Sequence, residues 1–202
     1  MAARSRRFQR HDGRRPNQLR PLSIEVNFIP SAHGSCLIAF GRTRVICTAS
    51  VAPGTPTWRA DSGLGWVTAE YGMLPASTST RKGRPIGKPD SRATEIQRII
   101  GRVMRSVLRM DRLGENTVYL DCDVIEADGG TRTASITGAY VALARAVAAG
   151  ESRGAFSPGV LAASVAAVSV GVVDGACVLD LDYVEDSAAE TDMNVAITGG
   201  GR

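Results

Sequence analysis

Two adjacent glycines, Gly129 and Gly130, separate a segment with the pattern of a strand from one with the pattern of a helix. In residues 117–125 apolar and polar residues alternate, as in a strand with one buried face. Residues 134–149 are rich in Ala and Gly and predict a helix that packs closely against a sheet. The fold must therefore contain a strand that leads directly into a helix, through a turn whose backbone needs glycine.

This turn also has the composition of an anion-binding site. Glycines allow successive N–H groups to converge on one point, and the helix adds its unpaired N-terminal N–H groups and the positive end of its dipole. Arg132 adds a forked cation that matches phosphate. A plain strand-to-helix turn with a surface arginine has the same short pattern, so other segments must distinguish the two.

Length and composition predict one soluble globular domain. The chain has 202 residues, of which 44% are hydrophobic and 22% charged, and its apolar runs are too short to cross a membrane. Its four cysteines are scattered, with two histidines to assist them, which argues against zinc and favours the reduced thiols of a cytoplasmic protein. We expect residues 1–9 to be a flexible basic tail and residues 10–202 to be a single domain.

Positive charge is concentrated in two segments. Residues 1–20 carry seven arginines against one aspartate, and residues 81–109 carry nine basic residues against two acidic ones. The rest of the chain is acidic, because the total is only +4. Of the 24 basic residues 22 are arginine, which favours forked contacts to a nucleic-acid backbone. A solvated tail and a solvated helix face remain the alternative for either segment alone.

The remaining pattern indicates an α+β protein. We expect strands near residues 23–28, 35–40, 44–52 and 66–71, followed by an exposed basic loop at 75–90. A helix should begin after Asp90 or Ser91, because apolar residues from 96 to 108 follow helical spacing. Strands at 162–173 and 176–181 flank a hairpin at Asp174–Gly175, and a last strand covers 193–197. Runs of strands with two main helices between them predict mixed sheets with packed helices.

An acidic cluster follows the hairpin, and it contains Asp186 and Asp192. Such a run is often a solvated loop. Here it lies between two predicted strands, so both carboxylates can project from strand ends toward one point. Two carboxylates suit Mg²⁺, which keeps several of its waters in proteins.

An anion cradle, a carboxylate pair and arginine-rich surfaces together suit phosphoryl transfer on a polyanion. The glycines are not followed by Lys-Ser or Lys-Thr, so the turn is not a P-loop. With two histidines in the chain, one of them in the basic tail, no Ser-His-Asp set is credible.

Several longer blocks of sequence resemble bacterial ribonuclease PH, a family of phosphorolytic 3′-to-5′ exoribonucleases. They are HDGR at 11–14, GWVTAEY at 65–71, EIQR at 95–98, DCDVI at 121–125, ADGGTRTASITGAY at 127–140, EDS at 185–187 and DMN at 192–194. The resemblance implies the ribonuclease PH fold, which is like domain 2 of ribosomal protein S5. It also implies an enzyme that trims extra nucleotides from tRNA 3′ ends, with inorganic phosphate as the attacking group and nucleoside diphosphates as products.

The resemblance assigns roles to particular residues. The attacking phosphate would be held by Arg92, Gly130, Thr131 and Arg132. Asp186 and Asp192 match the catalytic carboxylates; both would hold Mg²⁺, and one would also handle a proton on the leaving 3′ oxygen. The remaining roles concern RNA: Arg81 and Arg84 match basic-loop positions that hold tRNA, and Arg98 would line an RNA channel or pair with acids across a subunit interface.

Two departures from the family pattern bear on these expectations. The family usually has an arginine after Met-Leu-Pro, where this chain has Ala76. Relatives continue past the Gly-rich turn with another strand and a long helix, so we expect a C-terminally short domain at Arg202. The resemblance implies a hexamer, a trimer of dimers, if that short end permits it.

Two other functions remain open at this stage. One is a catalytically silent RNA-binding ring subunit of the same fold, and the other is a basic ribosome-associated structural protein. A silent subunit has no need for both the anion cradle and the carboxylate pair, and a structural protein leaves the acidic cluster without a purpose.

Overall fold

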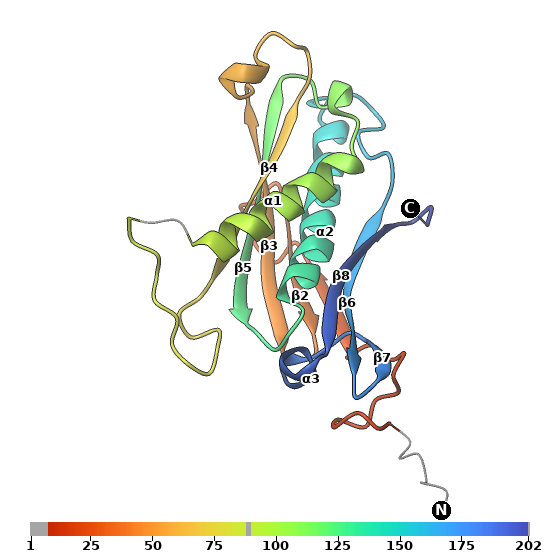
Figure 1. Cartoon of the computed structure of the whole chain (residues 1–202). Coiled ribbons are helices and arrows are strands. Elements are labelled where there is room, and N and C mark those ends of the chain that lie inside the picture. Colours follow the sequence, from red (N-terminus) through yellow and green to blue (C-terminus); the bar gives the residue numbers. More distant parts are fainter. Residues whose placement is uncertain (1–7, 88–89, 202) are drawn as a thin grey trace, which may run out of the picture.

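Two β-sheets and the helices packed on them form the protein (Figure 1). The structure is a computed structural model, and it describes residues 8–87 and 90–201. Most of the expected tail, residues 1–7, lies outside the described residues, as do residues 88–89 of the basic loop and the end at Arg202. Phe8, at the start of the described chain, packs against Val173, Val178 and Leu181 of the smaller sheet and its flank.

The larger sheet has five strands in the order β1-β2-β3-β5-β4. The strands are β1 Leu22–Val26, β2 Gly34–Phe40, β3 Thr43–Pro53, β4 Trp66–Met73 and β5 Asn116–Glu126. All neighbours are antiparallel except β4 and β5, which run parallel. Because β4 and β5 are parallel, their C-terminal ends lie at the same edge of the sheet. The basic loop and the double-glycine turn therefore begin side by side.

The smaller sheet consists of β6 Val165–Val173, β7 Ala176–Leu179 and β8 Thr191–Thr198, in the order β7-β6-β8. The hairpin predicted at Asp174–Gly175 joins β6 to β7, and both residues have positive φ angles of 49° and 72°, as this turn requires. Strand β7 stops at Leu179, two residues before the predicted end. Asp180 leaves the strand with a φ of 56°.

Helix α2, Thr131–Ser152, lies between the two sheets and contacts β2 and β3 on one side and β6 on the other (Figure 1). A helix covered from two sides needs small residues rather than one apolar stripe. At Gly138 a side chain would begin 2.6 Å from the sulfur of Cys47, so only glycine permits this approach. The helix begins three residues earlier and ends three residues later than the sequence predicts.

Helix α1, Ser91–Ser106, covers β4 and buries Ile96, Ile100 and Met104, as its spacing predicts. Asp90 is its N-cap and accepts hydrogen bonds from the backbone N–H groups of residues 92 and 93. Short 3-10 turns at Thr57–Arg59 (η1) and Met110–Arg112 (η2) lie in loops. The predicted α+β class with mixed sheets and packed helices is confirmed.

A third helix, α3 Tyr183–Ala188, was not predicted. Its sequence signal is a capping box, in which Asp182 accepts from the Glu185 N–H and Glu185 accepts from the Asp182 N–H. Within residues 8–87 and 90–201, no helix combines the length and the apolar character that crossing a membrane requires.

Candidate functional site

A pocket of about 500 Å³ lies at the end of the molecule where β4 and β5 finish and all three helices begin. Its walls bring together all six residues predicted to hold phosphate or metal: Arg92, Gly130, Thr131, Arg132, Asp186 and Asp192. They come from the first turns of α1 and α2, from α3 and from β8. Segments separated by about 100 residues thus converge on one cavity.

The double-glycine turn takes the conformation that its composition requires. Gly129 and Gly130 have φ angles of 76° and 66°, and Gly130 is the N-cap of α2 without a side chain to satisfy the first N–H groups. At Gly129 a side chain would begin 2.6 to 2.8 Å from the backbone of residues 181–183. This missing side chain lets the segment leading into α3 pack directly on the turn. The carboxylate of Asp186 is thereby carried to the cradle.

Arg132 points into this region with part of its hydrogen-bonding capacity unused. Its Nη2 donates to Glu95 Oε2 at 2.8 Å, while its Nε is buried without a hydrogen-bond partner. A buried guanidinium donor without a partner is costly, and the walls of an anion site commonly contain such a donor. Arg92 also lines the pocket; its side chain is exposed and forms no ion pair within the described part of the chain.

The two aspartates face the same space from different elements. The sequence pattern predicts Asp186 at the end of a strand. Instead it lies on α3, because the capping box starts a helix there. Asp192 is the second residue of β8. The pKa of the Asp186 carboxyl is raised, first by partial burial and second by the negative charge of Asp192. The guanidinium groups of Arg92 and Arg132 oppose this rise. Neither carboxylate has a hydrogen-bonding or ionic partner among the described residues.

Sequence reasoning missed several residues in or next to the pocket. Tyr71 is not in the pocket wall, but its hydroxyl donates to Thr131 Oγ1 at 3.0 Å, and burial raises the pKa of that tyrosine. Asn194 follows Asp192 by two residues on one face of β8, so the period of two was a usable signal. Ser169 and Tyr183 complete this side, and the sequence carries no distinct signal for them.

The basic loop enters the pocket through residues other than those predicted. Thr78, Ser79, Thr80 and Lys82 are in its walls, and Lys82 Nζ also lies 3.3 Å from Asp90 Oδ2. The predicted RNA contacts do not line the pocket. Two of them, Arg81 and Arg84, are exposed on the same loop, and the third, Arg98, is exposed on α1 beyond Arg92.

Behind the pocket, the N-terminal arm, residues 10–20, supports both the double-glycine turn and α3. The guanidinium of Arg20 forms two hydrogen bonds to the Asp180 carboxylate, at 3.0 and 2.7 Å, and donates to the carbonyl oxygen of Asp128 at 2.5 Å. Arg10 binds both oxygens of Glu185, at 2.6 and 2.5 Å. These pairs are buried, and they hold the double-glycine turn and α3 in position at the pocket.

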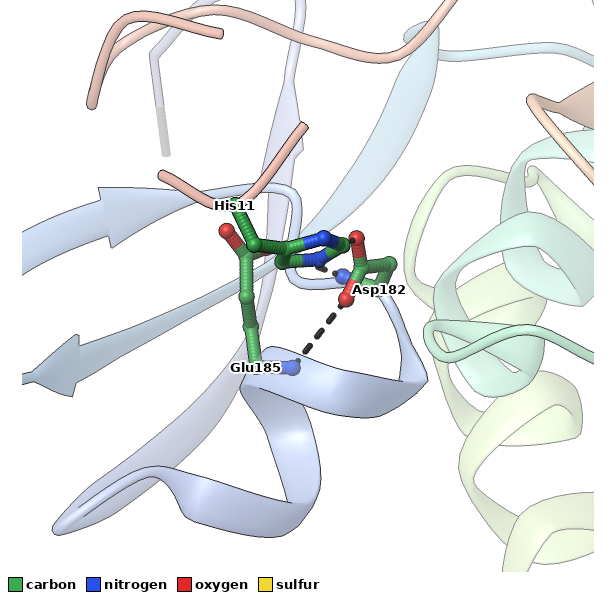
Figure 2. Close-up of side chains that lie close together, drawn as sticks. All are labelled: His11, Asp182 and Glu185. Carbon is green, nitrogen blue, oxygen red and sulfur yellow. Dashed lines mark hydrogen bonds and ion pairs between the residues drawn. The ribbon is translucent and has the colours of Figure 1, made fainter. Parts of the chain in front are cut away.

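His11, Asp182 and Glu185 lie together beside this arm, with ligand atoms within 4.8 Å of one another (Figure 2). His11 Nε2 lies 2.7 Å from Asp182 Oδ2. Both oxygens of Glu185 already accept from Arg10, and Asp182 caps α3. Arg10 supplies the positive charge that a metal would bring. This cluster therefore holds α3 in place and does not fit a cation site. Asp182 is the N-cap of α3, and Asp180 pairs with Arg20, which lies 160 positions earlier in the chain.

Comparison with known proteins identifies the family. Residues 18–149 match the family model described as "3' exoribonuclease family, domain 1", and residues 163–202 match domain 2 of the same family. The chain belongs to the RNase PH family of 3′ exoribonucleases. The two matches divide at the loop between α2 and β6, so the pocket of this RNase PH protein is formed by residues from both parts.

Two solved structures share this RNase PH fold. One is the crystal structure of rice (Oryza sativa) Rrp46, at 22% identity and a TM-score of 0.77, which covers 94% of this chain and 79% of that one. The other is the Archaeoglobus fulgidus exosome with RNA bound to the active site, at 23% identity and a TM-score of 0.78, which covers 95% of this chain and 78% of that one. Identities this low establish the fold alone.

Proposed function

We propose that this protein is a phosphate-dependent 3′-to-5′ exoribonuclease of the bacterial ribonuclease PH type. It would trim extra nucleotides from tRNA 3′ ends and release nucleoside diphosphates, as a tRNA nucleotidyltransferase. The observation that carries the proposal is the buried, unpartnered Nε of Arg132 in a pocket whose other wall carries Asp186 and Asp192. A cationic half and an anionic half in one cavity suit a reaction between two phosphates.

In this mechanism, the cationic half binds the nucleophile. Inorganic phosphate would accept hydrogen bonds from the free N–H groups at the start of α2 and from Arg132 and Arg92. Binding is required because one anion must approach another, and oriented donors offset their repulsion. Arg92 also gains a purpose here, since a cation in the first turn of a helix opposes the dipole unless an anion is present.

The anionic half would bind the scissile phosphate through a metal. Asp186 and Asp192 are two accessible carboxylates with a mutual repulsion, and Mg²⁺ is commonly held by one or two carboxylates, waters and substrate phosphate oxygens. Bound Mg²⁺ would stabilise negative charge on the phosphate under attack. One of the two carboxylates, Asp186 or Asp192, would also handle the proton on the leaving 3′ oxygen.

The substrate and assembly follow from the same proposal. Arg81, Arg84 and Arg98 would bind the tRNA backbone outside the pocket, and Lys82 would contact it at the entrance. We further propose a cytoplasmic homo-oligomer, a hexamer built as a trimer of dimers.

Product analysis tests this function. The protein is incubated with Mg²⁺ and a tRNA that carries extra 3′ nucleotides, with and without inorganic phosphate, and its oligomeric state is measured in parallel on a sizing column. We expect nucleoside diphosphates only when phosphate is present, and loss of the reaction when EDTA removes the metal. Nucleoside monophosphates formed without phosphate would contradict the proposal.

A second candidate is a catalytically silent RNA-binding ring subunit. Its support is the fold shared with Rrp46 and with an exosome. The same assay separates the two, because a silent subunit binds RNA as a well-folded ring without turnover. The intact set of Arg92, Arg132, Asp186 and Asp192 favours the enzyme.

A further inference from the structure

The loop that precedes β4 holds an exposed tryptophan in a fixed position. Trp58, in η1, is 65% exposed, which is unusual for a side chain of this size in a chain with 5% aromatic residues. Its ring lies edge-to-face against Trp66, with 4.7 Å between the ring centroids. The guanidinium of Arg59 lies over both rings and its Nε donates to the Gly65 carbonyl oxygen at 2.9 Å. An indole that is held in place and left in water is prepared to contact another molecule.

Three arginines that form no ion pair among the described residues, Arg59, Arg102 and Arg105, lie at or next to this tryptophan pair. Arg105 lies over Trp66, with its Cζ 4.6 Å from the ring centroid, and donates to the Val67 carbonyl oxygen. The pKa of Arg105 is lowered, mainly by burial and secondly by the positive charge of nearby Arg102. In the chain as described, neither of these arginines nor Arg59 forms an ion pair. The contrast with Arg10 and Arg20, whose guanidinium groups are paired with buried carboxylates, indicates a polyanion as the partner.

A basic path joins this cluster to the pocket. Helix α1 begins at the pocket with Arg92 and ends at Trp66 with Arg105, thirteen residues later, which corresponds to about 20 Å. Arg98, Arg102 and Arg105 are spaced by four and three residues, so they share one stripe of the helix. Strand β4 covers the same span, about 23 Å from Trp66 to the pocket residue Met73 (Figure 1).

We propose that Trp58, with Arg59 and Arg105, forms a stacking platform for single-stranded RNA several nucleotides upstream of the 3′ end. A base stacks on the free face of Trp58, and the arginine stripe of α1 neutralises the phosphates between the platform and the pocket. Stacking on an aromatic ring accepts any base, so the platform measures the length of the single-stranded segment and does not read its sequence. This inference rests on the proposed function only for the position of the 3′ end.

Binding of RNAs with tails of two lengths tests the platform. The full chain is titrated with one duplex that carries a 3′ tail of either three or twelve nucleotides, at fixed salt. We expect the wild type to bind the long tail about tenfold more tightly. Trp58→Ala should abolish this difference, whereas Trp58→Phe, which keeps an aromatic face, should retain most of it.

The outcomes separate the alternatives. Equal weakening of both RNAs by Trp58→Ala, or no weakening, would overturn the platform. A changed oligomeric state with unchanged RNA affinity would make Trp58 a protein contact and would also overturn it. Failure of the wild type to form nucleoside diphosphates would remove the proposed enzyme, while the dependence of affinity on tail length would still decide the platform.

Discussion

Glu185 and Asp186 are consecutive residues of α3 with opposite surroundings. Glu185 is 4% exposed and both of its oxygens are bound by Arg10, whereas Asp186 is accessible and faces a second carboxylate, Asp192. The cations differ in the same way, because Arg20 is fully paired and Arg132 has a buried donor without a partner. In the supporting region the charged groups pair with each other and stabilise the fold. In the pocket they are left available for a ligand.

Breaking a pair in the supporting region should have the largest effect on stability. Arg10→Ala removes the guanidinium that binds both oxygens of the buried Glu185 carboxylate and leaves, among the described residues, only the Asp182 N–H and a longer contact with Arg14 at 3.4 Å. We therefore expect the free energy of unfolding to fall by up to about 3–5 kcal/mol. The matched control is Arg42→Ala, whose partner Glu126 is solvent-exposed and whose loss should cost about 0–1 kcal/mol. Urea unfolding at pH 7 measures both. Equal losses would mean that burial does not distinguish the two pairs.

Removing one cation of the pocket, Arg132, should act on catalysis and leave the fold intact. Arg132→Ala is expected to lower kcat/KM for inorganic phosphate by about 10²–10³-fold, the usual effect of losing one oriented donor. RNA affinity should change little. Arg153→Ala, at the opposite end of α2, is the control and should behave as the wild type. If RNA affinity collapsed and phosphate dependence stayed the same, Arg132 would be an RNA contact.

Neutralising one carboxylate of the pocket should give the smallest change in stability, and in the opposite direction. The pKa of Asp186 is raised in the folded state, so its ionised form destabilises the fold above that pKa. Asp186→Asn should therefore stabilise the protein at pH 7, by no more than about 1 kcal/mol because solvent screens the repulsion.

The stability gained by Asp186→Asn should shrink as the pH falls through the raised pKa toward the usual value for aspartate. The wild-type carboxyl is then protonated and neutral, like the amide of the variant. Thermal unfolding at pH 7 and near pH 4 measures it, and phosphorolysis should be lost in the same variant. Glu185→Gln is the control and should destabilise the protein. A loss of stability in Asp186→Asn would show that its carboxylate is paired after all.

The two regions also differ in how far the sequence predicts them. The helical spacing of Ile96, Ile100 and Met104 predicts α1, and the double glycine predicts the start of α2 to within three residues. These signals are local, because each depends on neighbours within two turns. Helix α3 is too short for a period to emerge, and only the capping box from Asp182 to Glu185 marks it.

The supporting region could not be predicted from the sequence. The ion pairs of Arg10 with Glu185 and of Arg20 with Asp180 join residues separated by 160 positions or more, and nothing local selects one carboxylate over its neighbour. Residue patterns indicate the glycine turn with Arg132 and the two aspartates, whereas Arg92 and Thr131 come from family resemblance; the pocket gathers all six predicted residues. Lys82 and Tyr71 were missed because a loop lysine and a strand tyrosine carry no distinctive pattern.

The close packing of Gly129 on residues 181–183 makes the pocket depend on both sheets at once. The double-glycine turn follows the larger sheet, and the two aspartates belong to the smaller sheet and its flank. A chain in which the smaller sheet has separated from α2 holds the two halves of the pocket apart. The proposed nuclease activity would therefore arise only in the fully assembled state of folding, and a partly folded copy would be harmless to the RNA around it.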